Sequence, residues 1–90
     1  MQQTVSIIVK GKVQGVYYRQ STREKANKFR ITGTVKNLDN GDVEIIATGL
    51  TEQLNQFTEW CRQGPRRAVV TSVIVTPLSL QTFTGFLITQ

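Results

Sequence analysis

Residues 35–47 read VKNLDNGDVEIIA, in which a polar DNGD segment lies between Val35 and the apolar residues Val43, Ile45 and Ala47, all at even spacing. The dipeptide Asn40-Gly41 favours a tight reversal of the chain, because both residue types tolerate positive φ angles. Apolar residues at every second position are typical of strands with one face in a core. The stretch therefore predicts a β-hairpin with strands at about 32–38 and 42–48.

The segments on either side of this hairpin alternate between strand and helix patterns. Period-2 alternation or β-branched composition predicts strands, and apolar residues at helical spacing predict helices. The predicted strands are 4–10, 68–75 and a possible short 86–88, and the predicted helices are about 19–30 and 51–63. Thr51 is expected to be the N-cap of the second helix, Gly64-Pro65 to end that helix, and Pro77 to end the strand before it.

This order of elements, β-α-β-β-α-β with a possible fifth strand, predicts an α+β fold. The expected architecture is the ferredoxin-like split βαβ sandwich, in which an antiparallel sheet carries both helices on one face. Ninety residues suffice for one hydrophobic core and are too few for two. Residues 1–90 are therefore expected to form a single domain.

Composition excludes several classes of protein. No apolar run approaches the ~20 residues that cross a bilayer, so no membrane partner is expected. The first residues, Met1-Gln2-Gln3-Thr4, lack the features of a secretory signal, which predicts a cytoplasmic location. The chain has no histidine and a single cysteine, Cys61, so neither an intrachain disulfide nor a zinc site of the His/Cys type is available. We expect no metal and no cofactor.

The net charge of +5 is concentrated in the first part of the chain. Residues 1–36 contain eight Lys/Arg and one acidic residue, whereas residues 37–90 contain three Lys/Arg and five acidic residues. An anionic partner is therefore expected near the first third of the sequence. Charge alone leaves open whether that partner is a small phosphate or a nucleic acid.

The segment Gly11–Arg19 connects the first predicted strand to the first predicted helix. A glycine-bearing loop that enters a helix turns several backbone N–H groups toward one point, where the helix terminus adds partial positive charge. Arg19 can present two parallel donors to phosphate oxygens, a geometry that lysine lacks. No Gly-Lys-Ser/Thr follows, so a nucleoside triphosphate loop is not indicated. Taken alone, these residues also fit a plain turn followed by a solvated arginine.

Two motifs in the chain resemble signatures of the acylphosphatase family. The first, Gly-x-Val-Gln-Gly-Val-x-Phe/Tyr-Arg, is matched by Gly11, Val13, Gln14, Gly15, Val16, Tyr18 and Arg19. The second is matched by Gly33, Val35, Lys36, Asn37, Gly41, Val43 and Gly49. One position departs from the pattern, because Thr34 stands where the family usually has an aromatic residue. The resemblance runs from about Val5 to Val75.

The resemblance implies an enzyme that hydrolyses acyl phosphates to a carboxylate and inorganic phosphate without a metal or cofactor. It implies that Arg19 binds the phosphate and that Asn37 orients the attacking water. The implied phosphate cradle is the backbone of Gln14, Gly15, Val16, Tyr17 and Tyr18, where a phosphate or sulfate ion is also expected to bind. We expect a monomer whose partner is this small-molecule substrate, and we expect Thr34 to affect packing beside Asn37.

The hydrolysis of an acyl phosphate needs few catalytic groups, which agrees with the two catalytic residues that the resemblance implies. A carboxylate leaving group with a reference pKa near ~4 departs without being protonated, so no general acid is needed. Phosphoryl transfer then depends mainly on positioning and electrostatic stabilisation. Asn37 can hold a water but cannot act as a base, and we expect the substrate phosphate to accept the proton. Glu44 or Asp42 as a general base is the alternative.

Several other residues have plainer interpretations. Tyr18 is expected to support the loop from the core. For Tyr17 the sequence leaves open whether its side chain lines an acyl pocket. Trp60 and Cys61 are expected to pack in the core or at its rim. Arg66-Arg67 is expected to be a solvated loop pair.

Two other functions share this predicted fold. An RNA-binding module has the same element order and would suit a basic chain, but its middle strands carry aromatic residues that stack on bases. The predicted strand 42–48 has no aromatic residue and contains acidic ones. The other alternative is an accessory domain that binds carbamoyl phosphate or another anion within a larger assembly. The complete motifs and the short length of the chain argue against it.

Overall fold

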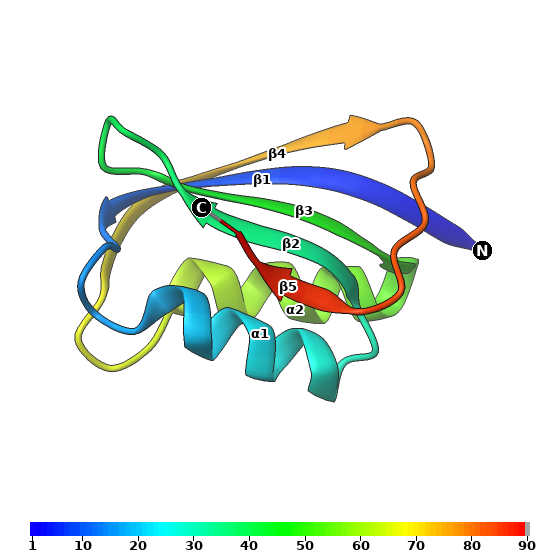
Figure 1. The fold of residues 1–90 in the computed structure, drawn as a ribbon, viewed down its shortest axis with the longest axis horizontal. Helices are drawn as coiled ribbons and strands as arrows, with labels where there is room; N and C mark the ends of the chain where they lie inside the picture. Colours follow the sequence, from blue (N-terminus) through cyan, green and yellow to red (C-terminus); the bar gives the residue numbers. More distant parts are fainter. Residues whose placement is uncertain (90) are drawn as a thin grey trace.

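A five-stranded sheet with two helices on one face makes up the computed structural model, which describes residues 1–89 (Figure 1). In chain order the elements are β1 (Gln2–Lys12), α1 (Tyr18–Lys28), β2 (Thr32–Asn37), β3 (Val43–Leu50), α2 (Thr51–Gln63), β4 (Val69–Leu78) and β5 (Phe86–Ile88). The predicted ferredoxin-like α+β fold is confirmed, including the short fifth strand. Gln90, the last residue of the predicted domain, lies outside the described residues.

The strands lie in the order β4-β1-β3-β2-β5. The first four pair antiparallel as predicted, but β5 pairs parallel with β2, so the sheet is mixed. The reason is the connection 79–85, which crosses from β4 to the opposite edge of the sheet (Figure 1). Gln81 fixes this crossing, because its N–H donates to Thr4 Oγ1 at 2.9 Å and its carbonyl accepts from Thr48 Oγ1 at 2.8 Å.

The core lies between the sheet and the two helices. Alternate residues of β1, β2 and β3 point toward the helices, and their apolar side chains are buried there: Ile7, Val9, Val35, Val43, Ile45 and Ala47. The helices bury Tyr18, Thr22 and Ala26 from α1 and Leu54, Phe57 and Cys61 from α2. Burying a large apolar side chain contributes roughly 1.5–3 kcal/mol, so this shared layer is the main source of stability.

Three local predictions differ from the structure. Thr51 is the first residue of α2 and Leu50 occupies the N-cap position, since β3 runs into α2 without an intervening loop. Pro77 does not end β4, which continues to Leu78. Because β4 is an edge strand, a residue that lacks an N–H is tolerated there. In the β2–β3 hairpin only Gly41 has a positive φ, of 97°, whereas Asn40 does not.

Candidate active site

A pocket of about 520 Å³ lies at the end of the sheet where the β1–α1 loop, the end of β2 and the α2–β4 loop meet. Its walls are formed by Val13, Gly15, Tyr17, Tyr18, Arg19, Gln20, Asn37, Arg67 and Ile88. This volume is within the usual range for small-molecule sites, about 300–1,000 Å³. Arg19 and Asn37, which come from different elements, therefore line one pocket as the sequence predicted.

The backbone of the β1–α1 loop has an alternating conformation. Gly15 has a φ of 74° and Tyr17 a φ of 63°, whereas Val16 between them has a negative φ. Alternation of this kind turns successive N–H groups toward the same side and forms an anion-binding concavity. Among residues 1–89, the amides of residues 15–20 donate to no protein acceptor. They are therefore available to a ligand, next to the positive end of the α1 dipole.

Three side chains hold this loop in place. Val13 and Val16 are buried on either side of Gly15. The side chain of Gln14 reaches the β2–β3 hairpin, where its Nε2 donates to the carbonyls of Leu38 at 2.8 Å and Asp42 at 2.9 Å. The sequence predicted a backbone role for Gln14 and missed this cross-link by its side chain.

Arg19 lies in the first turn of α1 and its charge is not neutralised by a neighbouring acid. The ion pairs among residues 1–89 join Lys10 to Asp42 and Lys36 to Glu44, and a third links Arg62 to Glu59. None of them includes Arg19, and the pocket has no acidic wall residue. The guanidinium therefore remains available for an anion.

Asn37 is the last residue of β2, on the face of the sheet that the helices cover. Its Oδ1 atom is buried and accepts no hydrogen bond from residues 1–89. A buried acceptor that receives no hydrogen bond lowers stability by about 1–3 kcal/mol. Such acceptors are therefore uncommon unless a ligand or a water donates to them. Asn37 also lines the pocket, where its side-chain amide can contact a bound molecule.

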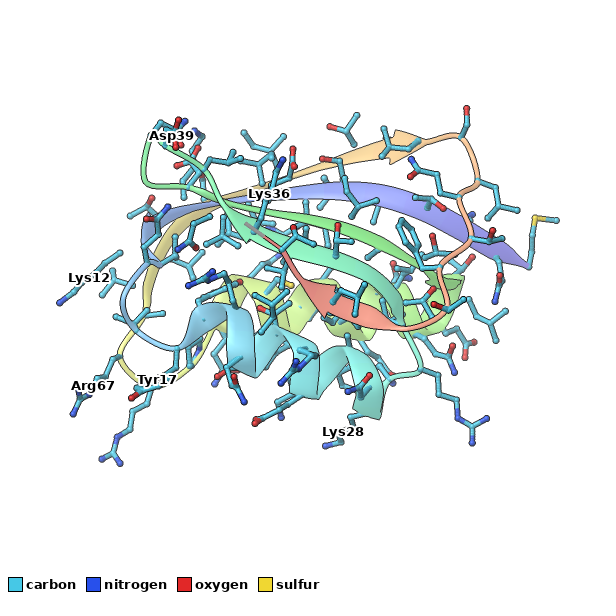
Figure 2. All side chains as sticks on the ribbon, viewed as in Figure 1. Lys12, Tyr17, Lys28, Lys36, Asp39 and Arg67 are labelled. Atoms are coloured by element: carbon cyan, nitrogen blue, oxygen red, sulfur yellow. The ribbon has the colours of Figure 1, made fainter. Side chains whose placement is uncertain are left out.

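The two carboxylates considered as alternative bases lie outside the pocket. Glu44 is directly opposite Lys36 on the sheet face that points away from the helices, and its Oε1 atom lies 3.6 Å from Lys36 Nζ. Lys36 is labelled in Figure 2, on the side of β2 that lies away from the helices. The carboxylate of Asp42 accepts from Lys10 Nζ at 2.7 Å and from Asn40 Nδ2 at 3.2 Å. Both carboxylates therefore form ion pairs with lysines outside the pocket.

The expected effect of Thr34 beside Asn37 is wrong. Successive side chains of a strand point to opposite faces, and Thr34 precedes Asn37 by an odd number of positions. Thr34 therefore lies on the face away from the helices, between Ile46 and Leu87 in the register of the sheet. Thr34 is not among the wall residues of the pocket.

Tyr18 supports the loop from the core, which confirms its predicted role. Its hydroxyl donates to the carbonyl of Cys61 at 2.7 Å, and burial raises the pKa of this phenol. In α2 that carbonyl would otherwise accept from residue 65, but Pro65 has no N–H to donate. Burial also raises the pKa of the Cys61 thiol to about 12.

Tyr17 and Arg67 both line the pocket, and Figure 2 shows their side chains near each other at one end of the molecule. Tyr17 is 77% exposed, and its backbone has the left-handed conformation that few non-glycine residues adopt. The prediction that Arg67 belongs to a solvated loop pair is incomplete, because Arg67 also lines the pocket. The pairing that brings it there, Lys12 with Val69, joins distant parts of the sequence and leaves no local signal.

Residues 1–89 contain no group of three or more His, Cys, Asp or Glu side chains placed to hold a metal ion. Within the same residues, neither helix has the length and apolar character needed to cross a bilayer.

The fold and the pocket define a ferredoxin-like α+β protein with a cationic pocket at one end of its sheet. The family model described as Acylphosphatase matches residues 5–88. The acylphosphatase of Marinobacter nauticus is 52% identical over 81 residues, which cover 89% of this chain and 88% of the relative. That of Vibrio parahaemolyticus is 49% identical over 79 residues, 88% of each chain.

Solved structures agree with these relatives. The crystal structure of acylphosphatase from Bacillus subtilis superposes with a TM-score of 0.95 at 38% identity, and the match covers 100% of both chains. The chain belongs to the acylphosphatase family and is an enzyme with acylphosphatase activity. Its substrate is accordingly a small molecule, which favours the enzyme over the RNA-binding and accessory-domain alternatives.

Proposed function

We propose that the pocket is the active site, with Arg19 and the loop amides binding the phosphate and Asn37 orienting the attacking water. One observation carries the proposal. Arg19 from α1 and Asn37 from β2 line the same pocket, and Asn37 presents a buried Oδ1 that lacks a protein donor. The first group offers charge to an anion and the second offers an acceptor to a water.

The phosphate is bound by two kinds of donor. The Arg19 guanidinium gives two parallel, charge-assisted hydrogen bonds to phosphate oxygens. The amides of residues 15–18 surround the same anion at the N-terminus of α1. Charge that develops on the equatorial oxygens during phosphoryl transfer is stabilised by these preorganised donors.

The hydrolytic step needs no protein base in this proposal. Asn37 Oδ1 accepts a hydrogen bond from the water and aligns it with the P–O bond that breaks. The water oxygen forms a bond to phosphorus, the carboxylate leaves with the electron pair, and the proton passes to a phosphate oxygen. A carboxylate is stable at neutral pH, so it requires no proton as it departs.

We propose further that the reaction needs no metal or cofactor and that the enzyme is a cytoplasmic monomer. The cytoplasm suits the single thiol, Cys61, which is buried and unpaired among the described residues. A single-domain organisation for residues 1–90 is supported by one cluster of buried residues to which strands β1, β2, β3 and β5 and both helices contribute.

The test is hydrolysis of benzoyl phosphate, followed by ultraviolet absorbance in excess EDTA, by the wild type and Arg19→Gln. Removing an electrostatic donor of this kind lowers kcat by about 10²- to 10³-fold, and we expect such a loss. Arg23→Gln is the matched control, because Arg23 is on the same helix and outside the pocket. Circular dichroism checks that each variant folds.

Three results would count against the proposal. Retention of more than a tenth of the activity in Arg19→Gln would remove Arg19 from the phosphate site. Loss of wild-type activity in EDTA would show that a metal takes part. A folded wild type without activity would mean that the pocket binds an anion without hydrolysing an acyl phosphate.

A further inference from the structure

A second arginine lines the pocket, in addition to the one that the proposed function assigns to the phosphate. Arg67 lies in the loop between α2 and β4 and lines the same pocket as Arg19. Neither arginine belongs to an ion pair among residues 1–89, and none of the pocket walls is acidic. The arrangement is suited to a ligand that carries more than one anionic group.

The loop that carries Arg67 is held against the phosphate cradle. At Gly64 the backbone has a φ of 71°, and a Cβ atom there would lie 2.9 Å from Cε2 of Tyr18. The loop therefore packs directly on the last residue of the cradle. Beyond it, Val69 pairs with Lys12 at the end of β1, where the cradle loop begins. Both ends of the α2–β4 loop are thus fixed next to the pocket.

Arg66 and Arg67 lie in the same turn but differ in their position relative to the pocket. The N–H of Ala68 donates to the carbonyl of Pro65 at 3.0 Å, which makes Arg66 and Arg67 the central residues of the turn. Both side chains are exposed, but only Arg67 lines the pocket. Arg66 therefore provides a control with the same charge and the same loop.

The surroundings of the two pocket arginines indicate different ligands. Arg19 lies beside a set of backbone amides, which together suit the several oxygens of a phosphate. Arg67 lies in a two-residue turn and offers one planar fork, which matches a single carboxylate. Tyr17 also lines the pocket, and its exposed ring provides an apolar surface.

We propose that Tyr17 and Arg67 form an acyl subsite that selects monophosphates of dicarboxylic acids. The ring of Tyr17 contacts the carbon skeleton of the acyl group, and Arg67 binds the second carboxylate. This inference rests on the proposed function, in which Arg19 binds the phosphate that is transferred.

The test compares benzoyl phosphate with 4-carboxybenzoyl phosphate, which has the same ring and one additional carboxylate. The measured quantity is the ratio of kcat/KM for the carboxylated substrate to that for benzoyl phosphate. We expect this ratio to exceed one in the wild type and to fall by roughly 2- to 5-fold in Arg67→Gln, the size typical of one charged contact at an exposed site. The change should lie in KM, and Arg67→Lys should restore part of the ratio.

Arg66→Gln is expected to leave the ratio unchanged, and added salt should lower the wild-type ratio because the contact is exposed. Equal losses on both substrates in Arg67→Gln would overturn the proposal and assign Arg67 to the transferred phosphate. An unchanged ratio in Arg67→Gln, or the same fall in Arg66→Gln, would overturn it as well. Wild type that hydrolyses neither substrate would contradict the proposed function itself, and the subsite with it.

Discussion

The side-chain amide of Gln14 lies 2.8 Å from the carbonyl of Leu38 and so joins the cradle loop to the residue that follows Asn37. The same nitrogen donates to the carbonyl of Asp42 at 2.9 Å, so both of its hydrogens are used. One side chain therefore sets the position of the loop next to Arg19 relative to the strand end that carries Asn37.

Replacing Gln14 should impair activity although its side chain is outside the pocket wall. In Gln14→Ala two backbone carbonyls each lose one of two donors, because the N–H groups of Gly41 and Leu38 still donate to them. The loss of two hydrogen bonds should lower the unfolding free energy by about 1–3 kcal/mol. A misplacement of about 1 Å between reacting groups can cost about 10²-fold, so kcat should fall by roughly 10- to 100-fold. Benzoyl phosphate kinetics and urea unfolding measure the two effects.

Gln14→Glu and Gln56→Ala complete this experiment. The carboxylate of Gln14→Glu has the same shape but faces two carbonyl acceptors, so it should be at least as damaging as alanine. Gln56 is exposed on α2, and its replacement by alanine should change neither quantity. Wild-type kcat in a folded Gln14→Ala would show that the cross-link does not position the site.

Asn37→Ala should lower activity without lowering the unfolding free energy. If Asn37 orients the water, its removal should lower kcat by about 10²- to 10³-fold. Because its Oδ1 is buried without a protein donor, the same change should leave the unfolding free energy unchanged or raise it by about 1 kcal/mol. A strong loss of stability on urea unfolding would show instead that Asn37 has a structural role.

Most of the fold was predictable because its elements carry local periodic signals. The strand alternation around Asn40-Gly41 and the apolar spacing of both helices led directly to the observed element order. The errors occurred where tertiary structure overrides local preference. Threonine is a residue type that favours the N-cap position, but the direct passage from β3 into α2 places Thr51 inside the helix. The parallel pairing of β5 depends on the crossing of residues 79–85, which has no local signature.

The site was predictable only in part, for a similar reason. Arg19 and Asn37 were identified through motif resemblance, and the structure brings them to one pocket. Arg67 was not identified as a wall residue, because its approach depends on the pairing of β4 with β1. The Gln14 cross-link was missed because it joins two loops that are distant in sequence.

Alkaline pH should destabilise the enzyme through two buried groups. The pKa of Cys61 is raised from 9.0 to about 12, and the pKa of Tyr18 lies above its usual value of 10.0, both mainly because of burial. The native state thus keeps protons that the unfolded chain releases. This contribution to stability is complete below pH 9 and is lost as the pH rises toward 12, at about 1.4 kcal/mol per pH unit for each proton.

Urea unfolding at several pH values between about 8 and 11 measures this slope. Cys61→Ala removes the thiol from a buried position and should reduce the slope above pH 9, whatever the variant's stability at neutral pH. An unchanged slope in Cys61→Ala would mean that the thiol is not protected in the native state.

The C-terminus of α1 offers a stabilising substitution outside the pocket. Arg30 has a φ of 59°, its N–H donates to Asn27, and the N–H of Ile31 donates to Ala26, which together form a Schellman motif. A left-handed conformation costs a non-glycine residue about 1–2 kcal/mol, and glycine loses about 0.5–1 kcal/mol in chain entropy. Arg30→Gly should therefore raise the unfolding free energy by up to about 1 kcal/mol.

Lys28→Gly is the matched control for this change, because it removes the same charge from the same helix end at a residue with helical geometry. It should lower stability by about 1 kcal/mol, the usual cost of glycine within a helix. For a domain of this size 1 kcal/mol shifts Tm by about 4–8 °C, so thermal unfolding separates the two variants. Neither residue lines the pocket, and kcat should not change. Destabilisation of both variants would show that the left-handed backbone of Arg30 carries no strain that glycine can relieve.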